Sequence, residues 1–162
     1  MEENLIKQRC CFTGHRPDKL GYTEEEIKPL LEKAIDGAIE GGYVTFISGM
    51  AKGTDIWAAE IVLEKKKENK ALHLVCAIPH PGFINGRSAQ ERRRYENIIK
   101  NADKCVLVSD RCLPGCYQKR NIWMVDRSSG VIAVFNGTKG GTANTINYAK
   151  RHGLKIVNIL ER

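Results

Sequence analysis

Two glycine-rich segments are the part of this sequence best suited to holding a small ligand. Residues 48–55 have the sequence SGMAKGTD and residues 136–142 the sequence NGTKGGT, and each lies between an apolar run and a helical pattern. Glycine lets the backbone turn tightly, and the free N–H groups at the start of a helix attract anions. The first segment is not a Walker loop, because no Gly-Lys-Ser/Thr follows at the required spacing. Each alone also fits a plain strand–helix turn, but the pair predicts an anion site.

Polar residues at other strand ends are suited to complete such a site. Thr13-Gly14-His15-Arg16 follows the first apolar run, and Arg120-Asn121 opens a later helical pattern. Arginine forms strong charge-assisted hydrogen bonds with phosphate oxygens. The turn Pro79-His80-Pro81-Gly82 follows the third run and could close over a ligand. A plain surface turn remains the alternative for the segment that follows the first run.

The charge of the chain is uneven. The net charge is +7; residues 82–162 carry 15 basic and 6 acidic side chains, a net +9, whereas residues 1–81 carry 11 basic and 13 acidic ones, a net −2. A basic half favours an anionic partner such as a nucleotide, a nucleic acid or a phosphorylated metabolite. A solvated basic surface is the alternative.

Composition narrows the class of protein. The 162 residues, 42% of them apolar, fit one globular domain over residues 1–162. No apolar run is long enough to span a membrane, and residues 1–9 lack the apolar segment of a secretory signal, so we expect a cytoplasmic protein. Cys10, Cys11, Cys76 and Cys105 lie in apolar runs and are expected to be buried. Cys112 and Cys116 flank a turn without a second ligand pair, so no metal site or disulfide is expected there.

Apolar runs and helical patterns alternate along the whole chain. This order predicts a Rossmann-like α/β sandwich of three layers, with a mainly parallel sheet of about six strands. One helix begins after Thr23, where Thr23 and Glu26 match a capping box, although Pro29 also suits a start near Lys28. It ends at Gly41-Gly42. The expected strands cover residues 9–13, 44–48, 72–78, 104–109, 131–135 and 155–159, and the other helices cover residues 54–68, 88–101, 117–126 and 142–152.

Several motifs together resemble one known family. These are the segment Cys11-Phe12-Thr13-Gly14-His15-Arg16-Pro17, residues 48–60, Arg120-Asn121-Ile122-Trp123-Met124-Val125-Asp126, and Gly140-Gly141-Thr142. In this order they are similar to the YspA/YpsA-like branch of the SLOG superfamily, over nearly the whole chain. The resemblance implies a Rossmann-like sheet, a nucleotide-like ligand and a bacterial or phage source. It does not imply catalysis, because function depends on the site and not on the fold.

The superfamily includes enzymes and nucleic-acid binders, which leaves three functions open. LOG-type phosphoribohydrolases cleave a base from a nucleoside monophosphate with a glutamate that follows their glycine-rich motif. Here Thr145 stands at that position. An N-glycosidase would therefore need Glu60 or Asp126 as its acid, because Asp55 is expected to cap a helix. The third function, single-stranded nucleic-acid binding, follows from the resemblance to DprA and from the basic second half.

We therefore predict a protein that binds or senses a nucleotide-derived, phosphate-bearing ligand at the carboxyl ends of the strands. Weak nucleic-acid binding is expected, membrane binding and a cofactor are not, and a homodimer is left open. The candidate catalytic residues are Glu60 and Asp126. The candidate ligand-binding residues are Thr13, Gly14, His15, Arg16, Ser48, Gly49, Met50, Gly53, Thr54, Asp55, Arg120, Asn121, Gly140, Gly141 and Thr142.

Overall fold

The computed structural model describes residues 2–161, and the side chains from Leu5 onward. Six parallel strands form one sheet in the order β4-β3-β2-β1-β5-β6. The predicted fold class, an α/β Rossmann-like sandwich, is confirmed. The strands are β1 (Arg9–Gly14), β2 (Thr45–Ser48), β3 (His73–Ile78), β4 (Lys104–Leu107), β5 (Gly130–Val134) and β6 (Lys155–Asn158).

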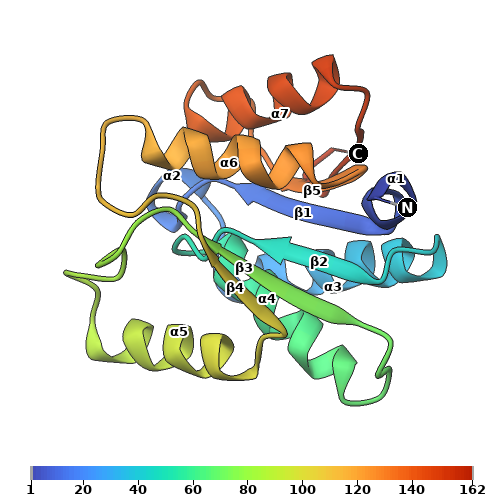
Figure 1. Ribbon diagram of the computed structural model, residues 1–162, viewed down its shortest axis with the longest axis horizontal. Helices are drawn as coiled ribbons and strands as arrows, with labels where there is room; N and C mark the ends of the chain where they lie inside the picture. Colours follow the sequence, from blue (N-terminus) through green and yellow to red (C-terminus); the bar gives the residue numbers. More distant parts are fainter. Residues whose placement is uncertain (1, 162) are drawn as a thin grey trace.

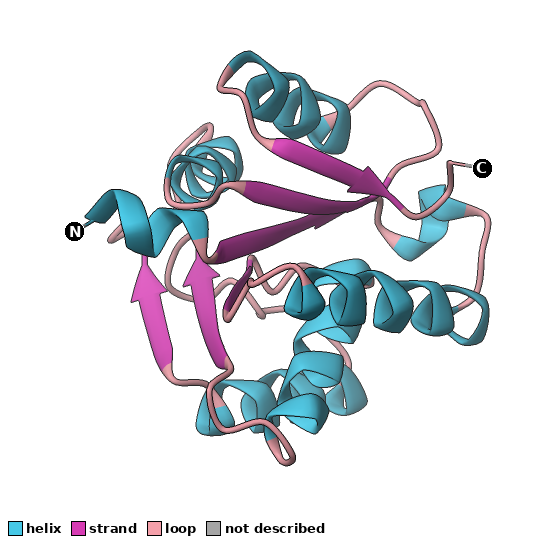
Figure 2. Cartoon of the chain, turned by 90° about the vertical axis from the view of Figure 1, so that its right-hand side faces the viewer, coloured by secondary structure: helices cyan, strands magenta, loops and turns pink. Residues whose placement is uncertain are grey.

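Helices cover both faces of this sheet (Figures 1 and 2). One face packs against α3, α4 and α5 through a core that includes Phe12 and Phe46, and the other packs against α6 and α7 through Cys11 and Ile47. Since side chains alternate along a strand, the neighbours Cys11 and Phe12 belong to opposite cores. The helices are α1 (Glu2–Lys7), α2 (Pro17–Leu20), α3 (Glu24–Glu40), α4 (Thr54–Lys66), α5 (Ala89–Asn101), α6 (Cys116–Asp126) and α7 (Gly141–Arg151).

Helix α3 begins where its capping box predicts. The Thr23 side chain accepts a hydrogen bond from the Glu26 N–H, and the Glu26 carboxylate accepts one from the Thr23 N–H. The alternative start near Lys28 is wrong, because Pro29 lies inside the helix. The apolar stripe of Ile27, Leu31 and Ile35 is fully buried. Its burial outweighs the hydrogen bond that proline cannot donate.

The edges of the sheet differ from the expected pattern of strands buried on both faces. β4 is an edge strand, and Cys105 on it is exposed, whereas Cys10, Cys11 and Cys76 are buried as expected. The prediction for Cys105 was wrong because it assumed helix cover on both faces. Among the described residues, no helix has the length and apolar character that crossing a bilayer requires.

The strand order fixes where a ligand can enter. The chain runs outward from β1 to β4, then returns to place β5 on the other side of β1. Connections therefore leave β1 and β5 toward opposite faces, and such a switch point leaves a crevice beyond the carboxyl ends of the two strands. The long loops that follow β3 and β4 extend at this end of the sheet (Figure 1).

Candidate anion-binding site

A cavity of about 160 Å³ occupies the crevice at the switch point. The residues that line it come from the end of β1, from the segment after β2 and the start of α4, from the loop after β3, and from the first turns of α6 and α7. Gly14 and Gly141 line it, and Gly49 lies beneath Arg120, which also lines it. The residues that line the cavity are Phe12, Thr13, Gly14, Arg16, Ala51, Asp55, Phe83, Arg87, Tyr117, Arg120, Asn121, Gly141 and Thr142.

The loop between β2 and α4 is held in a strained conformation. Met50 has a φ of 60°, and it is the one non-glycine residue with a positive φ among the described residues. The Ser48 hydroxyl holds the turn, because it accepts a hydrogen bond from the Met50 N–H (3.2 Å) and donates one to the Asp55 carbonyl (2.9 Å). Backbone strain of this kind costs energy and is concentrated at functional sites.

Two helices direct uncapped N-termini toward this crevice. α4 follows Gly53 and α7 follows Gly140, and neither N-cap has a side-chain hydrogen bond. Gly53 has a φ of 89° and would place a Cβ 2.9 Å from the ring of Pro17, so a larger residue does not fit there. The free N–H groups of both helices suit an anion.

Three arginines supply the positive charge of the cavity. Arg120 is 5% exposed and donates to the Gly49 carbonyl and to the Asn121 side-chain oxygen (2.8 Å). Arg87 donates to the Met50 carbonyl at 3.1 Å, and its guanidinium lies 4.6 Å from the centre of the Phe83 ring. Arg16 is exposed at the rim. Backbone carbonyls thus hold two of the guanidinium groups in place.

Asp55 faces these arginines from the start of α4. Burial raises its pKa, while Arg120, the Ala51 N–H and Arg87 oppose that shift. The carboxylate accepts the Ala51 N–H at 3.2 Å instead of capping its own helix, so the expected cap role is wrong. Of the described acids, it is the one that lines the cavity.

Two buried polar atoms near Gly14 have no hydrogen-bond partner among the described residues. They are Nε2 of His15 and Oγ1 of Thr54. The His15 ring stacks on Phe135 with 5.4 Å between ring centres, and burial together with Lys19 lowers its pKa, which favours the neutral form of the ring. Unsatisfied buried polar atoms are rare in folded proteins, and these two adjoin the proposed anion site.

The structure brings together most of the predicted binding residues. Eight of them line the cavity: Thr13, Gly14, Arg16, Asp55, Arg120, Asn121, Gly141 and Thr142. Seven others belong to the same loops without lining it: His15, Ser48, Gly49, Met50, Gly53, Thr54 and Gly140. Sequence reasoning missed Arg87, Phe83 and Tyr117. Arg87 precedes Ser88, the N-cap of α5, a position that gives no signal of a ligand contact.

The two predicted catalytic acids lie outside this cavity. Glu60 is on the outer side of α4, where it accepts hydrogen bonds from Arg94 at 3.0 Å and Lys28 at 3.3 Å. Asp126 ends α6, is exposed, and accepts a 2.7 Å hydrogen bond from the Tyr148 hydroxyl. Thr145, which replaces the LOG glutamate, donates to the Gly141 carbonyl within α7. Asp55 is therefore the acid best placed for chemistry in the cavity.

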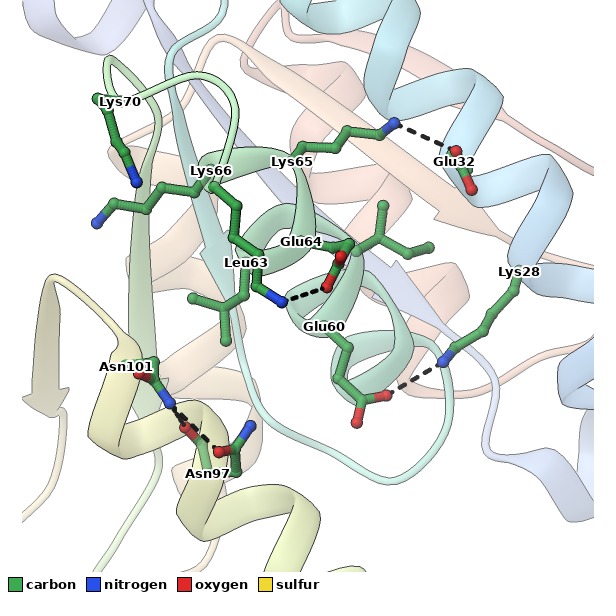
Figure 3. A pocket seen from close by; sticks show the side chains of 12 residues that line it. Lys28, Glu32, Glu60, Leu63, Glu64, Lys65, Lys66, Lys70, Asn97 and Asn101 are labelled. Atoms are coloured by element: carbon green, nitrogen blue, oxygen red, sulfur yellow. Dashed lines mark hydrogen bonds and ion pairs between the residues drawn. The ribbon is translucent and has the colours of Figure 1, made fainter.

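Glu60 borders a larger, open groove between α3, α4 and α5, of about 780 Å³ (Figure 3). Charged side chains line it, and several already pair with one another: Lys28 with Glu60, and Lys67 with Glu64 at 2.9 Å. Figure 3 shows Lys66 and Lys70 extending away from these pairs. No helix N-terminus or unpartnered buried polar atom of the described residues lies in its lining. The groove therefore lacks the features that mark the smaller cavity.

Replacing Glu60 tests whether the groove it borders takes part in ligand binding. We expect Glu60→Gln to lower the free energy of unfolding by about 1 kcal/mol, because it weakens partly exposed pairs with Arg94 and Lys28. Nucleotide affinity should not change. Glu64→Gln, which removes an exposed pair on the same helix, is the matched control and should change neither quantity. Loss of nucleotide binding in Glu60→Gln would place the ligand in the groove.

Comparison with known proteins agrees with this architecture. The model of the YspA SLOG family matches residues 10–159. The chain belongs to the YspA family of SLOG proteins. It is 32% identical over 118 residues to the SPbeta prophage-derived protein YoqJ of Bacillus subtilis (strain 168), an alignment that covers 65% of this chain and 69% of YoqJ.

Two solved structures of DNA processing protein A (DprA) have a fold similar to that of this chain. The protein from Streptococcus pneumoniae superposes with a TM-score of 0.66 at 18% identity, over 94% of this chain and 50% of that one. The protein from Helicobacter pylori, described with a single-stranded DNA binding mode, also gives 0.66, at 20% identity, over 96% of this chain and 66% of that one. This SLOG chain thus spans half to two thirds of each DprA chain. At such identities the likeness shows the fold alone.

Proposed function

We propose that this chain binds a nucleotide-derived, phosphate-bearing ligand in the cavity between β1 and β5. The observation that carries the proposal is the set of charges around one crevice: the guanidinium groups of Arg16, Arg87 and Arg120, and the N-termini of α4 and α7. Asp55 is the one carboxylate among the described residues that lines this cavity, although Glu91, outside the lining, also acts on Arg87. This excess of positive charge favours a phosphate group over a neutral ligand.

The rest of a nucleotide also has suitable partners. Phe83 and Tyr117 lie at the cavity with 5.9 Å between their ring centres, and Tyr117 is 42% exposed. Aromatic faces of this kind stack on nucleobases. The Asp55 carboxylate is an acceptor for a ribose hydroxyl, the role that an acidic residue takes in dinucleotide-binding folds. The proposal therefore assigns the phosphate to the arginines and the base to the aromatic pair.

The test is a variant that fills the cavity without disturbing the fold. A Cβ on Gly141 would meet no atom within 4 Å, and its φ does not require glycine. We expect Gly141→Val to stay folded and to weaken binding of AMP or ADP-ribose at least about tenfold, because the valine blocks approach to the first turn of α7, a loss of about 1.4 kcal/mol. Isothermal titration calorimetry measures this change.

The control is Gly37→Val, in the middle of α3 and also without neighbours within 4 Å. It should leave the affinity unchanged. Equal affinities of wild type and a folded Gly141→Val variant would contradict the proposed site. Single-stranded DNA is the second candidate ligand, since one DprA structure is described with it. We expect an oligonucleotide to bind weakly and to be released by salt, and tight binding at high salt would favour DNA over a free nucleotide.

Hydrolysis is the remaining alternative. It would rest on Asp55, whose raised pKa suits a general acid. Incubation with nucleoside monophosphates, NAD and ADP-ribose, followed by chromatography, should give bound ligand and no free base. Base release that disappears in Asp55→Asn would replace the binding proposal with catalysis.

A further inference from the structure

His80, Cys112 and Cys116 come together beside the cavity, although they are far apart in the sequence. One ring nitrogen of His80 and the two thiol sulfurs all lie within 4.8 Å of one another. His80 follows β3 in the turn after Pro79, Cys112 lies in the loop after β4, and Cys116 is the first residue of α6. Three elements that end at the same edge of the sheet thus supply one ligand atom each.

The surroundings fix the imidazole in one tautomer. His80 is 7% exposed, and its Nδ1 lies 2.7 Å from the Pro81 carbonyl. A carbonyl only accepts, so Nδ1 carries the hydrogen and Nε2 keeps its lone pair. A backbone carbonyl that binds the second ring nitrogen is the usual support of a metal-bound histidine. The present partner of Nε2 is the Tyr117 hydroxyl at 3.3 Å, a long contact that a metal ion would replace.

We propose that His80, Cys112 and Cys116 bind a zinc ion. Zinc binds thiolate at about 2.3 Å and imidazole at about 2.0–2.1 Å, which places ligand atoms about 3.5–3.8 Å apart in a tetrahedral site. Since the three atoms lie within 4.8 Å of one another, each pair needs to close by at most about 1.3 Å, and Cys112, an exposed residue, supplies one of the sulfurs. Two thiolates and one imidazole favour zinc over magnesium or calcium.

The ligand set leaves the fourth position of the tetrahedron open to water. Three protein ligands with one open position are typical of reactive zinc sites and not of structural ones, which have four. No metal was expected from sequence, because two cysteines are too few for a zinc site and His80 lies more than 30 residues before Cys112. The ring of Phe83, which lines the proposed nucleotide cavity, packs edge-on against the His80 ring with 6.1 Å between ring centres. The zinc site thus adjoins the proposed nucleotide cavity, although none of its three ligands lines that cavity.

The first experiment is titration of reduced, metal-free protein with Co²⁺ and then Zn²⁺. We expect one equivalent of Co²⁺ to bind with thiolate charge-transfer absorption and to be displaced by Zn²⁺, whereas Mg²⁺ has no effect. Cys112→Ser should weaken zinc binding at least about tenfold, and Cys105→Ser, which removes the other exposed cysteine, should not. Absence of binding at micromolar zinc, or equal affinities of both variants, would overturn the proposal.

A second readout needs no variant. Cys105 and Cys112 are both exposed, so N-ethylmaleimide should modify both in metal-free protein. With zinc bound, peptide mass spectrometry should show Cys112 protected and Cys105 still modified. Equal modification of Cys112 with and without zinc would contradict its role as a ligand even if the protein binds zinc elsewhere.

Discussion

Arg120→Met should lower the free energy of unfolding by about 4 kcal/mol at neutral pH, the largest single effect we expect in this chain. Arg120 is almost completely buried and holds the strained β2–α4 loop through the Gly49 carbonyl. It also faces Asp55, whose carboxylate is buried. Without the guanidinium, the carbonyl loses its donor and the carboxylate loses its principal opposite charge. Urea denaturation followed by circular dichroism measures the change.

The deficit of Arg120→Met should depend on pH in a defined direction. Burial raises the pKa of Asp55 in the folded state above its ordinary value, so ionised Asp55 costs stability and protonated Asp55 does not. The stability that protonated Asp55 contributes relative to the ionised form is fully present below the ordinary pKa of aspartate, and it is lost as pH rises through the pKa of the folded state. Because removal of Arg120 raises the folded pKa further, we expect the variant's deficit to be largest near pH 7 and to shrink on acidification.

A second variant separates the charge effect from loss of packing. Arg120→Met combined with Asp55→Asn removes the uncompensated carboxylate and should recover a large part of the lost stability, without the pH dependence. The amide oxygen introduced by Asp55→Asn can still accept a hydrogen bond from the Ala51 N–H. If the double variant is no more stable than Arg120→Met at pH 7, the arginine acts through the Gly49 carbonyl and its packing alone.

Gly14→Ala should be the second most damaging substitution, at about 3 kcal/mol, the upper range of overpacking effects. A Cβ at this position would lie 2.6 Å from Cβ and 2.9 Å from Cγ2 of Thr54. Gly14 ends the central strand β1 and Thr54 begins α4, and both are held by the core. Neither can move without separating the helix from the sheet, so the strain cannot relax locally. Thermal unfolding measures the loss.

Gly141→Ala is the matched control for Gly14→Ala. It lines the same cavity, yet a Cβ there would meet no atom within 4 Å, so its unfolding midpoint should be close to that of wild type. Thr54→Ala should rescue Gly14→Ala only in part, since the Cβ of residue 54 remains in contact. Equal midpoints for the two glycine variants would show that β1 and α4 have room to separate.

The parts of the fold that sequence could predict are those that depend on local pattern. Apolar runs placed all six strands, because a strand between two helical layers is apolar on both faces. The rule failed at β4, which has no neighbour beyond it, and therefore at Cys105. The helices α1 and α2 were missed because six and four residues are too short to show an apolar stripe.

The candidate site was predicted where the loop chemistry is local and missed where it depends on packing. The turns after β2 and β5 could be recognised as candidate ligand sites from their glycine content and their position before a helix. Arg87 does not, because only the strand order brings the β3–α5 loop over the cavity. Glu60 could have been placed from sequence: five residues after Asp55, it lies about 140° around the helix axis. A helix that turns Asp55 toward the cavity must therefore turn Glu60 away from it.

The central position of β1 also determines when the cavity comes into existence. Thr13 pairs with Ala133 and Gly14 with Val134, so about 120 residues of chain separate the two walls of the crevice. Closing so long a loop is a late and slow event in folding. A nascent chain that has not yet released β5 has the basic loops but no cleft. A ligand that requires the closed crevice would bind only the complete chain, and its binding energy would add to the stability of the whole domain.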